Sequence, residues 1–241
     1  MRENFKRYFF ENFYKNGLEA YVNAEIEEKF WNLTQLMLKT NEVMNITAIT
    51  DIEKIIPLHY ADCVKIAELI PENALVADIG CGGGFPILPL AIVRPDLKLL
   101  GIDSTEKKAK YVAETGNKLR LNVKTVAGRA EELAKQPDLR QNFDVVVSRA
   151  VARLNILNEL CMPFTKIGGR FITMKGAAGM QEFEEAKTGI QKLGGVLDEV
   201  EEYDLYLNEQ SEKRTIFVIK QERSISTTYP RAFASIKKKP L

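Results

Sequence analysis

The feature that most constrains the fold is an alternation of short apolar runs with longer helical patterns, which begins near residue 75 and continues almost to residue 220. This alternation is typical of right-handed β-α-β crossovers and of an open, largely parallel sheet. The last two apolar runs differ, because only residues 207–213 lie between them, too few for a crossover helix. We therefore expect a mostly parallel sheet that ends in an antiparallel hairpin.

The periodicity also gives the positions of the elements. We expect strands at 75–79, 98–102, 123–127, 143–147, 169–174, 195–206 and 214–220, and helices between them at 86–93, 105–120, 152–163 and 180–193. The predicted class is therefore α/β, with a seven-stranded sheet.

Residues before the sheet show a helical period without strand alternation, as the spacing of Phe30, Met37 and Val43 illustrates. A turn at 71–73 separates this stretch from the first strand. The predicted organisation is an N-terminal helical extension at 1–70, a sheet-bearing domain at 71–222 and a basic C-terminal tail at 223–241.

Composition excludes several classes of protein. With 45% hydrophobic and 28% charged residues, the chain has enough apolar material for a substantial core and is not disordered. The longest apolar stretch, 85–93, falls short of the roughly 20 residues that span a bilayer. The first residues lack the apolar block of a secretory signal, so we expect a cytoplasmic protein. Three scattered cysteines and one histidine favour neither disulfides nor a metal site.

The segment 76–86 leaves a strand, turns on glycines and enters a helix whose first turn accepts Pro86. Glycines at such a turn let the backbone approach a ligand closely. The spacing is G-x-G-x-G, whereas a dinucleotide fingerprint requires a glycine where this chain has Phe85. Asp78, beside the turn, would repel a pyrophosphate but attract a ligand that carries an ammonium and a sulfonium. This combination favours S-adenosylmethionine.

A second acid, Asp103, ends the next strand and can accept hydrogen bonds from both ribose hydroxyls of an adenosine. Asp78 and Asp103 would then hold opposite ends of one cofactor. The segment after the third strand lies over the adenine in this architecture, and its backbone can bond the base edge. There we expect the guanidinium of Arg129 to point toward the crevice, while Glu131 has the alternative of simply opening a helix.

The end of the fourth strand, at Arg149, faces the group to be transferred. It lacks the Asn/Asp-Pro-Pro-aromatic loop expected of enzymes that methylate exocyclic amines. Arg149 and Lys175, which ends the fifth strand, are cations suited to a phosphate, a carboxylate or a base acceptor. Their convergence suggests a polyanionic substrate, although Lys175 could instead be paired with a nearby acid. Cys161 lies in an apolar helix and is expected in the core.

The net charge of +1 conceals local polarity. Residues 98–129 hold eight Lys or Arg against three acids, and residues 229–241 hold four cations and no acid. Such segments suit contact with phosphates. His59, the only histidine, lies in the helical extension, where we expect a structural or substrate-lining role in preference to proton transfer.

Several motifs follow one another in a characteristic order. They are Asn45-Ile46-Thr47-Ala48-Ile49, His59-Tyr60-Ala61-Asp62, Asp78-Ile79-Gly80-Cys81-Gly82-Gly83-Gly84-Phe85-Pro86, Arg129-Ala130-Glu131, Ser148-Arg149-Ala150, Lys175-Gly176 and the ending with Pro230-Arg231 and Lys239-Pro240-Leu241. Together they resemble the RsmG (GidB) family of bacterial 16S ribosomal RNA guanine-N7 methyltransferases over nearly the whole chain. Two departures are Ile87, where the family commonly has glycine, and a tail without the usual Gly-x-Pro.

The resemblance implies a class I S-adenosylmethionine-dependent methyltransferase, Rossmann-like, that transfers a methyl group to N7 of a guanine in 16S ribosomal RNA. Guanine N7 presents a lone pair, so attack needs no general base. The partners implied are 16S ribosomal RNA or small ribosomal subunits, without membrane or metal, and we expect a monomer. A methyltransferase of another substrate class and a catalytically silent cofactor- or RNA-binding module stay open as alternatives.

Motifs and resemblance together give the expected site. The cofactor residues are Asp78, Gly80, Gly82, Phe85, Asp103, Ser104, Thr105, Ala130, Glu131 and Arg149, and the residues expected to act on the nucleotide are Arg149, Lys175 and Arg129.

Overall fold

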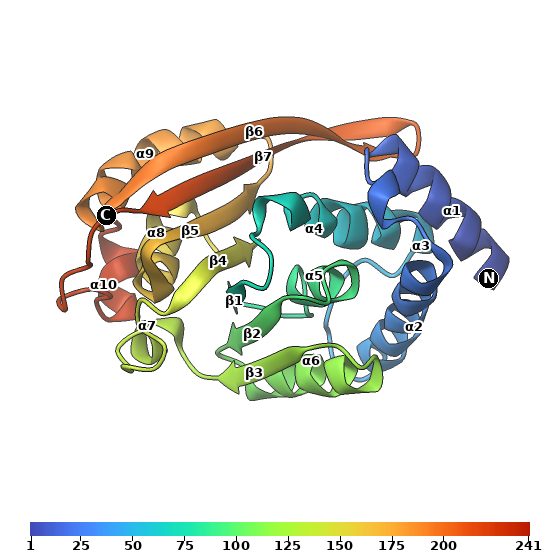
Figure 1. Ribbon diagram of the computed structural model, residues 1–241, viewed down its shortest axis with the longest axis horizontal. Helices are drawn as coiled ribbons and strands as arrows, with labels where there is room; N and C mark the ends of the chain where they lie inside the picture. Colours follow the sequence, from blue (N-terminus) through green and yellow to red (C-terminus); the bar gives the residue numbers. More distant parts are fainter.

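Seven strands form a single sheet in the order β3-β2-β1-β4-β5-β7-β6 in the computed structural model, which describes residues 1–241 (Figure 1). The strands are β1 Leu75–Ile79, β2 Lys98–Asp103, β3 Val123–Ala127, β4 Phe143–Arg149, β5 Thr165–Lys175, β6 Gly195–Leu207 and β7 Gln210–Gln221. Strands β1 to β5 pair in parallel, whereas β7 runs antiparallel to both β5 and β6. The expected α/β class and the antiparallel hairpin at its end are confirmed.

Helices cover the sheet and form the N-terminal part of the chain. They are α1 Arg2–Lys15, α2 Ala24–Asn41, α3 Ile52–Ile55, α4 Asp62–Val64, α5 Ile87–Val93, α6 Glu106–Lys118, α7 Ala130–Leu133, α8 Leu154–Cys161, α9 Gly179–Lys192 and α10 Phe233–Lys238, with a π-helical stretch Ile56–Ala61 joining α3 to α4. All four expected crossover helices are present, displaced by at most a few residues at their ends. The short helices α7 and α10 had no clear periodic signal.

The hairpin of β6 and β7 is longer than the sequence suggested. The polar residues that were expected to form a turn continue the ladder, and Lys213 pairs with Asp204 across the strands at 2.8 Å. Asn208, with φ of +54°, makes the tight turn. The hairpin reaches as far as α1 (Figure 1), where the side-chain amide of Asn12 donates to the carbonyl of Tyr206 at 2.9 Å.

Aromatic side chains hold the N-terminal helices together. The ring centroids of Phe9 and Phe13 lie 4.1 Å apart, and those of Phe30 and Tyr60 lie 4.7 Å apart. These rings belong to the same apolar cluster as Val76 in the sheet. The expectation for Val43 was wrong: its side chain is 88% exposed because α2 ends before it. The boundaries at 70 and 222 stay a prediction, and the shared core joins the extension to the sheet.

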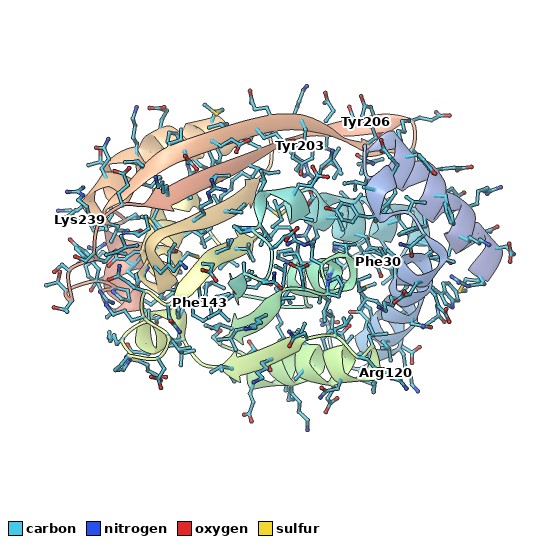
Figure 2. The ribbon with its side chains drawn as sticks, viewed as in Figure 1. Phe30, Arg120, Phe143, Tyr203, Tyr206 and Lys239 are labelled. Atoms are coloured by element: carbon cyan, nitrogen blue, oxygen red, sulfur yellow. The ribbon has the colours of Figure 1, made fainter.

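The C-terminal tail packs against α8. Arg231 donates to the fully buried carboxylate of Glu159, at 2.6 Å from its Nη2 atom, and Ile236 of α10 is also fully buried. The tail lysines, of which Lys239 is labelled in Figure 2, are exposed at the end of the molecule opposite α1. The tail therefore forms a fixed basic surface.

Candidate cofactor and nucleotide site

The glycine turn after β1 is fixed by β2 and closely surrounded. The amide of Gly80 donates to the carbonyl of Ile102 at 2.8 Å. Gly80 has φ of +77°, a conformation that favours glycine, and a Cβ there would lie 2.4 Å from Cγ2 of Val151. A Cβ on Gly83 would lie 2.5 Å from Cγ2 of Ile46. Because Gly80 and Gly83 have no side chains, the backbone of the turn lies directly against Val151 and Ile46, which are far from it in the sequence.

Asp103, at the end of β2, holds the turn from the other side. Its Oδ2 atom accepts from the amide of Gly82 at 2.9 Å, and its Oδ1 atom accepts from the amide of Thr105 at 2.8 Å. A carboxylate has about four lone-pair sites, so both oxygens keep capacity to accept from a ligand. The carboxylate is therefore oriented before any ligand arrives.

A cavity of about 410 Å³ lies over this turn. Seven of the expected cofactor residues line it, namely Gly80, Gly82, Phe85, Asp103, Ser104, Thr105 and Arg149. Other polar residues of the lining include Thr47, which belongs to a motif quoted above without an assigned role, and Lys108, which the sequence did not single out. His59 also lines the cavity, in keeping with the structural or lining role expected for it. Asp78, Ala130 and Glu131 do not line this cavity.

Asp78 lies behind the turn and is completely buried. Its Oδ2 atom accepts from the amide of Ile87, the first residue of α5, at 3.2 Å, whereas Oδ1 has no partner. Burial raises the pKa of this carboxyl to about 7, against the opposing effects of the Ile87 amide and of Arg149. Ile87 stands where the family commonly has glycine, but the bond to Asp78 uses only the backbone amide of this residue and therefore does not depend on its side chain.

Arg149, at the end of β4, is fixed on several sides. Its Nη1 atom donates to the carbonyl of Leu58 at 2.7 Å and to Asp62 at 2.9 Å, and Nη2 lies 3.4 Å from Nδ1 of His59. The guanidinium lies 5.8 Å from the ring centroid of Phe85. Its Nε atom is buried without a partner. One donor is therefore available in a fixed direction.

Asp62 joins three distant elements and was not singled out for a role by the sequence. Besides Arg149, it accepts from the hydroxyl of Tyr203 on β6 at 2.9 Å and lies 3.4 Å from Nε of Arg214 on β7. Tyr203 is labelled in Figure 2, at the β6/β7 hairpin near the upper edge of the molecule. Asp62 belongs to the motif that begins at His59, so a signal existed, whereas nothing marked Arg214.

A second cavity, of about 490 Å³, adjoins the first and shares Arg149 to Val151 with it. Its charged walls include Lys175 and Arg214. The Nζ atom of Lys175 donates to the carbonyl of Ala152 at 2.7 Å and lies 3.0 Å from Glu182, so the alternative considered for Lys175, pairing with an acid, is present. An ammonium has three donors, which leaves one free.

Arg129 does not reach either cavity. Its exposed guanidinium lies 3.8 Å from Glu131 and 5.7 Å from the ring centroid of Phe233 in the tail. The expectation that Arg129 points into the crevice is wrong, because the tail offers an aromatic face on the outer side. Glu131 and Ala130 open α7, which is the alternative considered for Glu131.

A buried cysteine, possible metal ligands and possible membrane-spanning helices are the remaining features to consider. Cys161 is fully buried, as expected of a core residue. No group of three or more potential metal ligands gathers in the chain. None of its helices has the length and apolar character needed to cross a membrane.

The first cavity fits S-adenosylmethionine. Glycine backbone lines one wall, an oriented carboxylate at Asp103 suits ribose hydroxyls, and the unpartnered Nε atom of Arg149 suits an anionic group. The ionisable carboxyl of Asp78 behind the turn suits a cationic one. The ribose of an adenosine and an anionic group therefore find complementary residues in the lining, whereas Asp78 could act on a cationic group only through its charge, from behind the turn.

Known proteins that are similar to this chain include ribosomal RNA methyltransferases. The model of the GidB family, described as rRNA small subunit methyltransferase G, matches residues 26–208. Ribosomal RNA small subunit methyltransferase G of Acetivibrio thermocellus is 39% identical over 94% of this chain and 93% of its own length. The protein of that name from Clostridium novyi is 40% identical over 91% and 93%. A solved structure of M. jannaschii TYW2 in complex with AdoMet is 18% identical and covers 66% of this chain and 74% of its own, with a TM-score of 0.52, which shows a shared fold.

Proposed function

The chain belongs to the GidB family of rRNA small subunit methyltransferase G, and on this premise we propose that its two adjoining cavities hold the cofactor and the target nucleotide. It is an S-adenosylmethionine-dependent enzyme that methylates N7 of a guanine in 16S ribosomal RNA. The observation that carries the proposal is that both cavities meet at Arg149 and Val151, at the end of β4.

The cavity over the glycine turn is the proposed cofactor site. Asp103 would accept from the ribose hydroxyls, and the amides of the turn would approach the ligand closely. Asp78 would act from behind the turn through its charge. The bound cofactor supplies an activated methyl group on its sulfonium. Ala130 and Glu131 lie outside the cavity, so a contact with the adenine would have to come from the loop that precedes them, between β3 and α7.

The second cavity is the proposed guanine site. Arg149 borders both cavities, and the free donor of Lys175 and the guanidinium of Arg214 can meet a phosphate or the O6 acceptor of guanine. Asp62 and Glu182 are occupied by these cations, so neither serves as a base. Since N7 needs no deprotonation, catalysis would rest on positioning and on fixed charges.

Contact with ribosomal RNA would extend to exposed lysines around the site. A groove of about 310 Å³ between α2 and α6 is lined by Lys107, Lys110 and Lys118, close in sequence to Lys108 in the cofactor cavity. The tail adds Lys237 to Lys239. These cations suit phosphates. We further propose that the protein acts as a monomer, since one chain supplies the walls of both cavities, and that it acts in the cytoplasm, since its proposed substrate is ribosomal RNA.

Two variants test the assignments separately. Asp103→Ala should weaken S-adenosylmethionine binding at least tenfold in calorimetry, whereas Asp138→Ala, an exposed acid in another loop, should not. Lys175→Met should keep cofactor affinity but lose methyl transfer to 16S ribosomal RNA. Unchanged affinity of the Asp103 variant would overturn the cofactor site, and a normal transfer rate of the Lys175 variant would overturn the guanine site. Transfer to a protein or small molecule instead of RNA would support the alternative substrate class.

A further inference from the structure

A segment of the N-terminal extension, residues 45–49, lies against the glycine turn and closes one wall of the cofactor cavity. We call it the strap. Its Ile46 lies beside Gly83, and Thr47 lines the cavity. The side chain of Asn41 fixes its backbone: Oδ1 accepts from the amides of Ile46 and Thr47 at 2.8 and 3.1 Å, and Nδ2 donates to the carbonyl of Thr47 at 3.0 Å. Asn41 therefore fixes the backbone of the strap at Ile46 and Thr47.

That side chain is held by His59 instead. The Oγ1 atom of Thr47 lies 2.8 Å from Nε2 of His59 and also accepts from the amide of Ile49 at 3.0 Å. The imidazole stacks on Phe85, with ring centroids 4.4 Å apart and planes 13° apart. Its Nδ1 atom faces Arg149 at 3.4 Å. His59 thus bridges the strap and the end of β4.

The partners determine where the hydrogens lie. An arginine can only donate, so Nδ1 of His59 accepts and Nε2 carries the hydrogen of a neutral imidazole. Burial, assisted by the charge of Arg149, lowers the pKa of His59 to about 3, so this form persists at neutral pH. Nε2–H then donates to Thr47. With a second donor at Ile49, both lone pairs of the Thr47 hydroxyl are occupied, and its own hydrogen is free.

We propose that Thr47 donates this hydrogen bond to the carboxylate of the cofactor's methionyl group, and that His59 is a positioning residue that orients it. Arg149 lines the same cavity, and its Nε atom is buried without a partner, so a cation with an unused donor lies near this side. Another part of the lining, from Asp103 to Thr105, suits the ribose, so we assign the carboxylate to the part formed by Thr47. The inference rests on the proposed cofactor site.

The test compares two ligands, S-adenosylmethionine and 5′-methylthioadenosine, which lacks the amino acid part. Thr47→Val, nearly isosteric, should bind S-adenosylmethionine about tenfold more weakly and methylthioadenosine unchanged, and Thr47→Ser should restore the affinity. Thr125→Val is the control, because its hydroxyl donates to the carbonyl of Ala109 outside the cavity. His59→Ala should repeat the selective loss, and His59→Gln, with a donor at a similar reach, should recover part of it.

The outcomes distinguish a wrong cofactor site from a wrong role for Thr47. If the wild type binds neither ligand, the cofactor site itself is wrong and the inference fails with it. If the wild type binds both but Thr47→Val is unaffected, or loses both ligands equally, only the role of Thr47 is overturned. The Thr47 variants decide the matter even if the His59 variants unfold, and circular dichroism of each variant checks the fold.

Discussion

Gly80→Ala is the most informative single change to the glycine turn. The residue has φ of +77°, and a left-handed conformation costs an alanine about 1–2 kcal/mol of stability. The added Cβ would also lie 2.4 Å from Cγ2 of Val151, which must move. Val151 is 41% exposed and can yield, but it follows Arg149 closely in the chain and lines both cavities. Stability should therefore fall modestly, while cofactor affinity falls at least tenfold.

Gly168→Ala isolates the backbone contribution. Gly168 has φ of +81°, and no atom lies within 4 Å of a Cβ built on it. Both variants should lose about 1–2 kcal/mol, which corresponds to roughly 2–8 °C in thermal unfolding. Calorimetry with S-adenosylmethionine should then separate them, with near-normal affinity for Gly168→Ala only. Equal affinities in the two variants would refute the reasoning that Val151 couples the turn to the site.

Three further predictions concern charge. Because burial raises the pKa of Asp78 to about 7, the free energy of unfolding of the wild type should fall as pH rises from about 4 to 7, whereas that of Asp78→Asn should not. In urea unfolding above pH 7 the variant should be more stable by up to about 4 kcal/mol, and an equal dependence of the unfolding free energy on pH in both proteins would contradict this. Arg231→Met should cost about 3–5 kcal/mol in urea unfolding, since the fully buried Glu159 loses its cation and keeps only the backbone amide of residue 231 as a partner; a loss below 1 kcal/mol would count against it. Lys107→Gln should lower the slope of log affinity for 16S ribosomal RNA against log salt by about 1, and an unchanged slope would remove Lys107 from the RNA surface.

The sheet could be predicted from the sequence because each of its features is local. The periodicity of each strand, the glycine turn and the short link between β6 and β7 each involve only a few consecutive residues. Asp103 likewise ends the first strand after the turn. The polar hairpin tip was underestimated, because the pairing of Asp204 with Lys213 stabilises a stretch whose composition alone is typical of a turn.

The network around Asp62 could not be predicted in the same way. It joins Arg149, Tyr203 and Arg214, which lie between 87 and 152 residues away along the chain. No periodicity or spacing records such contacts, and they exist only once the sheet has brought β4, β6 and β7 beside α4. Arg129 shows the converse, since its position after a strand suggested a role in the crevice, whereas its guanidinium lies beside Phe233 of the tail.

The central claim is most directly tested by the position of the transferred methyl group. The protein is incubated with methyl-tritiated S-adenosylmethionine and with 16S ribosomal RNA, free or in small subunits, and the RNA is digested and its nucleosides are separated. Label is expected in 7-methylguanosine from one site in 16S ribosomal RNA, and none is expected with Lys175→Met. Label on another base, on another atom of guanine or on protein would contradict it.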